Sequence, residues 1–333
     1  MIDLNNKEEI LKIDPLDTAG TVEKLAKQCK VAWEEVNALK IEKFDDIQNI
    51  VFCGMGASMY GAMVIKSLLG SQMPLPSEIV SDYLVPGYVN ENTLVVLTSY
   101  SGTTEEVLSC AHDARSKGAK MVVLTKGGPL AAFAKANDIP SYIFDGKLNA
   151  GNVPRLGAGY SILGLIGLLN KVGAIDIEDG EISDALTRFV ERIEDIKQRA
   201  QTDYKLYINK IPVIFAAEHL AGNAQILRNQ FNETSKTFSC FFLIPDLNHH
   251  LMEGLQFPEN APLQFTILNS LNYSDKIKKR ISLTLDVVRQ NKRSVNEFTT
   301  EGSTVYEDFL ETLQYGCFVT LYLGLHYNQN PAT

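Results

Sequence analysis

Short apolar runs separated by helical patterns recur along the whole chain. Residues 49–53 and 94–97 are apolar without alternation, as is typical of strands buried on both faces of a parallel sheet. Because strand-like and helical segments alternate, the pattern predicts an α/β fold with two doubly wound parallel sheets flanked by helices. Further strands are expected at 78–81, 121–124, 142–144, 211–217, 238–243 and 263–268.

The same pattern predicts two domains, which fits a length of 333 residues. The first domain is expected over residues 1–180, with a helical N-terminal segment packed on it, and the second over 181–333. The acidic stretch 176–183, which contains Gly180, is expected to link them. Helices are expected at 105–117, 130–136, from about 160, and at 184–202, 220–231, around 250–255, 275–290 and 304–327.

One strand–turn–helix segment carries an unusual number of hydroxyl groups. In residues 94–106, LVVLTSYSGTTEE, the apolar run passes directly into a turn that includes Ser99, Ser101 and Thr104. Thr103 or Thr104 suits the N-cap of the following helix. Free N–H groups and the helix dipole at that point favour an anion. Hydroxyl groups are also ordinary turn residues, but their density here favours a site for a small phosphate ester.

A second loop, Gly-Met-Gly-Ala-Ser, follows the strand at 49–53 and offers Gly56 and Ser58. The full GxGxxG spacing of a dinucleotide site is absent, and only Asp82 suits a ribose-binding acid, so a phosphate ester is favoured over a dinucleotide. Loops at the carboxyl ends of parallel strands lie at the same edge of the sheet. We therefore expect both loops to converge, together with Arg155 from the glycine- and proline-rich loop 147–159.

Overall composition excludes several classes of protein. The net charge of −9 argues against a nucleic-acid binder, which would present a basic surface. The five cysteines are scattered and form no CxxC motif, which is typical of free thiols in the cytoplasm. No apolar run approaches 18 residues and no signal core follows Met1, so we expect neither a membrane span nor a leader.

Several motifs, in this order, resemble those of the bifunctional phosphoglucose/phosphomannose isomerases, whose domains have the sugar isomerase (SIS) fold. Loops GMGAS and SYSGTTEE resemble the two phosphosugar loops of SIS domains, and NVPR at 152–155 resembles the family's proline–arginine loop. The segments NE, ending at Glu233, and PDLNH, ending at His249, resemble its catalytic segments and narrow the resemblance to this family. The match extends from about residue 20 to the end.

The resemblance implies a cytoplasmic homodimer of glycolysis and gluconeogenesis that interconverts an aldose and a ketose phosphate without a metal or organic cofactor. Glu233 would move a proton between C1 and C2 through an enediol, and His249 of the partner subunit would assist ring opening. The substrate is expected to be glucose 6-phosphate, with mannose 6-phosphate as a second one, and the product fructose 6-phosphate. The phosphate would be held by Gly56, Ser58, Ser99, Ser101, Thr104 and Arg155.

The sequence departs from the family pattern at a few places. Ala57, Met59, Thr103 and His250 stand where the family has two glycines and two asparagines. The family also continues into a short helix with a lysine that contacts the site, whereas this sequence ends at Thr333.

Other interpretations of these residues stay open at this point. Glu233 follows an apolar helix and also suits a solvated helix end. The pair His249-His250, near Asp246 and Glu253, could suggest a metal, but further ligands at suitable spacing are missing. Alternatives to the hexose phosphate isomerase are another SIS enzyme that acts on an amino-sugar phosphate, and a non-catalytic sugar-phosphate sensor.

Overall fold

The computed structural model describes residues 3–4 and 6–333 and consists of two compact units. We call Glu23–Ser183 the N-terminal unit, and Asp184–Thr333 together with Met1–Val22 the C-terminal unit. The boundary lies close to the expected one at 180/181, whereas residues 1–22 group with the C-terminal half instead of the N-terminal one. Helices α1 (Lys7–Ile13) and α2 (Thr18–Val22) belong to this segment, and the Gln314 side chain donates a hydrogen bond to the Val22 carbonyl.

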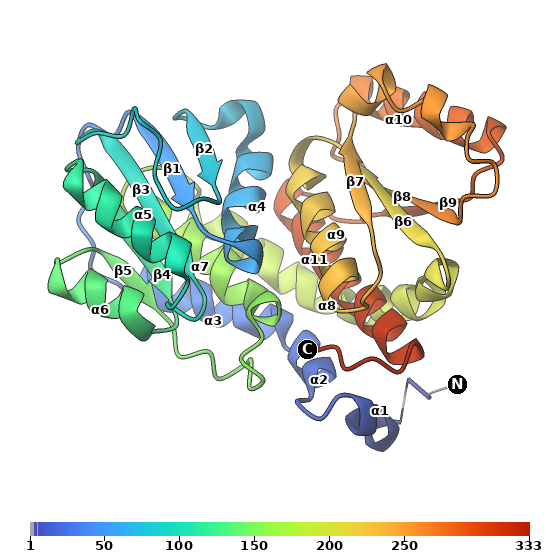
Figure 1. The fold of residues 1–333 in the computed structure, drawn as a ribbon, viewed down its shortest axis with the longest axis horizontal. Coiled ribbons are helices and arrows are strands. Elements are labelled where there is room, and N and C mark those ends of the chain that lie inside the picture. Colours follow the sequence, from blue (N-terminus) through green and yellow to red (C-terminus); the bar gives the residue numbers. More distant parts are fainter. Residues whose placement is uncertain (1–2, 5) are drawn as a thin grey trace. The chain divides into compact units, whose positions relative to one another are not determined.

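The N-terminal unit is built on a five-stranded parallel sheet (Figure 1). Its order is β2-β1-β3-β4-β5, and β3 is buried along its whole length. This burial explains why its sequence is apolar without alternation. The strands are β1 (Asn49–Cys53), β2 (Ser77–Val80), β3 (Thr93–Ser99), β4 (Lys120–Thr125) and β5 (Ser141–Ile143).

Helices cover both faces of this sheet. Helices α5 (Glu105–Ser116) and α6 (Gly128–Ala136) bury their apolar sides with alternate strand residues such as Val95 and Leu97. On the other face, Gly164 of α7 lies close to Leu124 and Tyr142, where a larger residue would not fit. The helices on that face are α3 (Leu25–Asn37), α4 (Tyr60–Leu69) and α7 (Ala158–Lys171).

The C-terminal unit has a four-stranded parallel sheet of order β7-β6-β8-β9. This is the same order as that of the first four strands of the N-terminal sheet, β2-β1-β3-β4. Helix α11 (Val305–His326) is buried on all sides from Glu307 to Leu325, as expected for a largely apolar helix. The remaining elements are β6 (Ile211–Ala216), β7 (Cys240–Leu243), β8 (Leu263–Asn269), β9 (Val295–Thr299), α9 (Ala221–Glu233), α10 (Asp275–Gln290) and α8 (Asp179–Asp203), whose first five residues belong to the N-terminal unit.

Three expectations about secondary structure were wrong. The helix around 250–255 is absent, and the segment forms two 3₁₀ turns, η6 (Asp246–His249) and η7 (Glu253–Leu255), since Gly254 and Pro258 disfavour a continuous helix. Strand β9 was missed because its sequence, VNEFT, has only two buried side chains. Helix α8 starts inside the expected linker, at Asp179, where acidic residues suit a first turn.

The fold expected from the sequence is confirmed as two α/β units with parallel sheets flanked by helices. Within the residues that the structure describes, no helix combines the length and the apolar character needed to cross a membrane.

Candidate functional site

The loop after β1 combines two glycines with different roles. A Cβ atom on Gly54 would meet the Thr98 side chain at 2.6 Å, so this position is too crowded for any other residue. Gly56 begins the 3₁₀ helix η1 (Gly56–Met59) with a φ of +53°, which favours glycine, and it faces open space. An exposed backbone with nothing above it can be approached closely by a ligand.

Ser58 joins this loop to the one after β3. Its Oγ accepts a hydrogen bond from the Tyr100 N–H at 3.1 Å. Element η1 also lies against β3. The expected convergence of the two loops at the carboxyl edge of the sheet is therefore present within the N-terminal unit.

The loop after β3 is organised by its own hydroxyl groups. The Oγ of Ser99 and the Oγ1 of Thr104 are 2.7 Å apart, and the Ser99 Oγ also accepts from the Gly102 N–H. Ser99 is buried, so its hydroxyl holds the conformation of the loop from the protein interior. Ser101 is exposed and lies 2.8 Å from the Thr103 hydroxyl, which places two hydroxyl groups on the outer side of the loop.

Helix α5 begins at this loop without a side-chain cap. Thr104 is the N-cap residue by backbone conformation, but it makes no capping hydrogen bond because its hydroxyl contacts Ser99. The first N–H groups of a helix need an acceptor, and the helix dipole favours a negative one. The start of α5 therefore suits an anion such as a phosphate.

Arg155 lies beside these loops on the short helix η3 (Pro154–Gly157), and only 7% of the residue is exposed. Element η3 packs against η1, which carries Gly56 and Ser58. All six residues expected to bind the phosphate thus lie in the N-terminal unit, on two linked loops and an adjoining helix.

The two expected catalytic residues lie in the C-terminal unit, on different elements. Glu233 is the last residue of α9 and His249 is the last residue of η6. Both are exposed in the chain. The neighbouring His250 lies close to Asp246, with 3.5 Å between Nε2 and Oδ2.

Among residues 3–4 and 6–333, no three His, Cys, Asp or Glu side chains are grouped as metal ligands would be. None of the five cysteines, all of which the structure describes, forms a disulfide bond, and Cys53 and Cys110 are fully buried core residues.

The structure also contains a buried polar cluster that sequence reasoning missed. Asp308 on α11 is fully buried, and its Oδ2 lies 2.9 Å from His219 Nε2 and accepts from the Ser270 hydroxyl and the Asn272 amide. Burial alone would raise the pKa of Asp308, but these hydrogen bonds outweigh it and hold the pKa below its usual value. The four residues lie on three separate segments, namely η5, the loop after β8 and α11, so no local sequence motif indicates the cluster.

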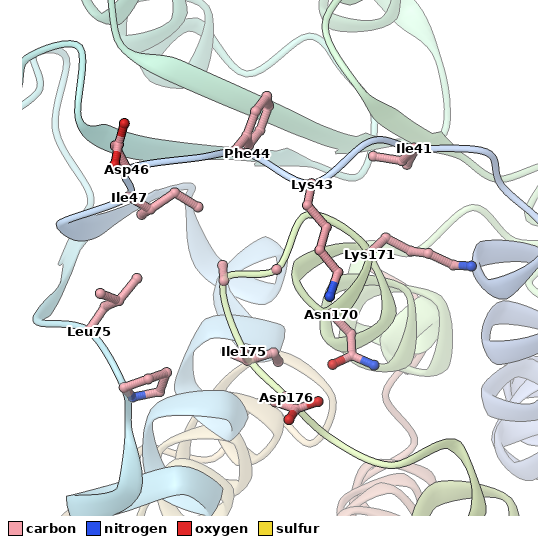
Figure 2. Close-up of a pocket in the computed structure, with 13 residues that line it drawn as sticks. Ile41, Lys43, Phe44, Asp46, Ile47, Leu75, Asn170, Lys171, Ile175 and Asp176 are labelled. Atoms are coloured by element: carbon pink, nitrogen blue, oxygen red, sulfur yellow. The ribbon is translucent and has the colours of Figure 1, made fainter.

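A cavity of about 800 Å³ lies elsewhere in the N-terminal unit (Figure 2). Ile47, Leu75 and Ile175 are among the residues that line it. Its residues 41–47 precede β1 and residues 74–75 precede β2, so the cavity is at the amino ends of the strands. The loops expected to bind phosphate follow the strands, and none of the expected site residues lines this cavity.

Comparisons with known proteins agree with this arrangement. A model of the SIS domain matches residues 43–141, and a model of the bacterial phospho-glucose isomerase C-terminal SIS domain matches residues 195–333. The chain is therefore similar to SIS proteins along both units, and in its second half to bacterial phospho-glucose isomerases. The first match covers β1 to β4 with α4, α5 and α6, and the second covers β6 to β9 with α9, α10 and α11.

Bifunctional phosphoglucose/phosphomannose isomerases are similar to nearly the whole chain. The bifunctional phosphoglucose/phosphomannose isomerase of Caldicellulosiruptor bescii is 28% identical over 93% of this chain and 94% of its own length. That of Aquifex aeolicus is 27% identical over 90% of each chain. Among solved structures, tagatose-6-phosphate ketose/aldose isomerase from Escherichia coli has a TM-score of 0.75 at 13% identity, over 95% of this chain and 94% of that one.

Proposed function

We propose that the protein is an aldose–ketose isomerase that interconverts glucose 6-phosphate, and also mannose 6-phosphate, with fructose 6-phosphate. The observation that carries this proposal is the end-to-end similarity to relatives named for both isomerase activities. The linked hydroxyl loops at the uncapped start of α5 support it independently.

The phosphate of the sugar is assigned to the loops of the N-terminal unit. The exposed backbone at Gly56, the hydroxyl of Ser101 and the N–H groups at the start of α5 supply neutral donors. Arg155 supplies a positive charge. Ser58, Ser99 and Thr104 hold the shape of these loops and complete the proposed set.

The proton transfer is assigned to Glu233. Its carboxylate removes the proton from C2 of the open-chain aldose, which gives an enediol, and returns it to C1 to form the ketose. The proton on the C2 oxygen is lost and the C1 oxygen gains one, so the reaction is balanced without an oxidant. His249 of the partner subunit is proposed to donate a proton to the ring oxygen during ring opening, since an imidazole exchanges protons near neutral pH.

We also propose that the protein is a homodimer and that it is located in the cytoplasm. Two aromatic side chains that flank the segment with His249, Phe238 and Phe257, are each 71% exposed. Large exposed aromatic groups are enriched where proteins associate. Five cysteines without a disulfide bond accord with a reducing compartment.

The deciding experiment is turnover of fructose 6-phosphate, coupled to glucose-6-phosphate dehydrogenase, for the wild type and the Glu233→Gln variant. We expect the wild type to be active, and kcat to fall about 10²- to 10⁴-fold in the variant. Binding of fructose 6-phosphate, measured by calorimetry, should change little. Glu191→Gln is the matched control, because Glu191 is an exposed glutamate of the same unit on α8.

Other outcomes would separate the alternatives. A wild type that binds fructose 6-phosphate without turnover would contradict the isomerase and favour a sensor. Turnover of glucosamine 6-phosphate instead of the hexose phosphates would identify an amino-sugar enzyme. Equal turnover of the wild type and Glu233→Gln would remove Glu233 as the base.

A further inference from the structure

The segment that precedes Arg155 is tied to the phosphate loops through one buried amide. Asn149 is 1% exposed, and its Nδ2 donates to the Tyr100 hydroxyl at 2.7 Å and to the Val153 carbonyl at 2.8 Å. Val153 is the residue before η3, on which Arg155 lies. A single side chain therefore connects the base of η3 to Tyr100.

Tyr100 is itself part of the phosphate loop. Its N–H donates to Ser58, and its carbonyl accepts from the Lys126 N–H at 3.0 Å. Its ring is buried against Phe144, with 5.2 Å between the centroids. A Cβ atom on Gly157, the last residue of η3, would lie 2.2 Å from this ring, so the helix rests directly on it. Tyr100 thus contacts all three segments of the candidate site.

These contacts leave η3 little freedom relative to the loops. The Gln28 side chain donates to the Leu156 carbonyl at 2.9 Å and holds η3 from the side of α3. Burial raises the pKa of Tyr100 to about 12, so its hydroxyl keeps its proton at neutral pH. A guanidinium placed by rigid neighbours binds an anion without a further ordering cost.

We propose that Tyr100 and Asn149 are positioning residues that hold Arg155 in place to bind the phosphate of the substrate. This inference rests on the proposed function of the same loops. It assigns Tyr100 and Asn149 no contact with the reacting atoms. Loss of the hydroxyl–amide bond is expected to weaken phosphate binding through Arg155 and to leave the proton transfer unaffected.

The test compares Tyr100→Phe with Tyr142→Phe. Both changes delete one buried tyrosine hydroxyl in the same unit, and both rings contact Phe144. Tyr142 bonds to Glu35 instead, at 2.6 Å. We expect Tyr100→Phe to raise the KM for fructose 6-phosphate about three- to tenfold with little change in kcat, because one hydrogen bond is lost. Tyr142→Phe should leave both constants unchanged. Asn149→Ala tests the same bond from its other side if Tyr100→Phe folds poorly.

A double variant shows whether the effect passes through Arg155. In Arg155→Ala, adding Tyr100→Phe should raise the KM no further, since the residue that it positions is already gone. If Tyr100→Phe raised the KM by the same factor with and without Arg155, the proposal would be overturned. An increase in KM of the same size in Tyr142→Phe would also overturn it.

The binding of inorganic phosphate, titrated by calorimetry, gives a readout separate from turnover. If the wild type binds phosphate and Tyr100→Phe weakens this binding, the positioning role stands even where isomerase turnover is absent. If Tyr100→Phe and the wild type bind phosphate equally, the positioning role fails while the isomerase assignment is untouched.

Discussion

Gly56 and Glu218 occupy equivalent places in the two units and share a left-handed backbone. Each begins the 3₁₀ helix after the first strand of its sheet, η1 after β1 and η5 (Glu218–Leu220) after β6, with φ of +53° and +41°. Glu218, however, has a side chain, and its carboxylate accepts from the N–H and hydroxyl of Ser274. Ser274 is the N-cap of α10, the counterpart of α5.

The two units therefore have a similar topology but differ in the residue at this position. In the C-terminal unit, the Glu218 carboxylate occupies this place and is bonded to Ser274, the residue before α10. In the N-terminal unit, the residue at the equivalent place is Gly56, which has no side chain and faces open space. Neither α5 nor α10 has a side-chain cap, so the two units differ in the residue that begins the 3₁₀ helix. The physical difference accords with the assignment of the phosphate to the N-terminal loops.

Replacing Gly56 by alanine is expected to affect both stability and binding. The positive φ should cost about 1 kcal/mol of unfolding free energy. The added methyl group should also hinder the approach of the phosphate and weaken fructose 6-phosphate binding. Gly118→Ala is the control, because Gly118 also has a positive φ, +72°, and open space around it. Chemical denaturation and calorimetry measure the two effects, and equal binding by both variants would speak against a ligand at Gly56.

Mixing two inactive variants tests the proposed dimer and the origin of His249. Glu233→Gln and His249→Ala homodimers should each have low turnover. After the two proteins are mixed and allowed to exchange subunits, activity should return, because a mixed dimer contains one site with both residues intact. Sedimentation should show a dimer for the wild type. A monomer, or no recovery of activity in mixed dimers, would contradict a contribution of His249 across the interface.

Two glutamates four residues apart on α11 should respond to pH in opposite directions. Burial would raise the pKa of Glu307, but hydrogen bonds from Ser303, Arg188 and Thr304 lower it below its usual value of 4.5. Burial raises the pKa of Glu311, and the Glu301 N–H and Arg192 offset this only in part. Glu307 therefore stabilises the fold above pH 4.5, an effect lost as the pH falls through its folded pKa. The contribution of Glu311 is present below pH 4.5 and is lost as the pH rises.

At pH 7 the two glutamine substitutions should accordingly differ in sign. Glu307→Gln should lower the free energy of unfolding by about 1–3 kcal/mol, because a charged acceptor of several hydrogen bonds is lost. Glu311→Gln should raise it slightly, because a buried charge is removed. Urea denaturation at pH 7 and pH 4 measures both effects. A similar loss of stability in the two variants would show that burial of Glu311 carries no cost.

The sequence by itself determined the class of fold and led to the two loops proposed to bind phosphate. Apolar runs such as 94–97 predict buried parallel strands because the hydrophobic pattern is local, and both loops follow such strands. Local signals were weaker where burial is incomplete, so strand β9 was missed and a helix near residue 250 was wrongly expected.

Only the tertiary structure decided how the site residues are held. The link from Ser58 to Tyr100 spans 42 residues of sequence and the link from Tyr100 to Asn149 spans 49, and no periodicity records such pairs. The same holds for Asp308 and His219, which are 89 residues apart. Hydrophobic spacing specifies which face of an element is buried, whereas the partner that a buried polar atom finds depends on how the chain folds back on itself.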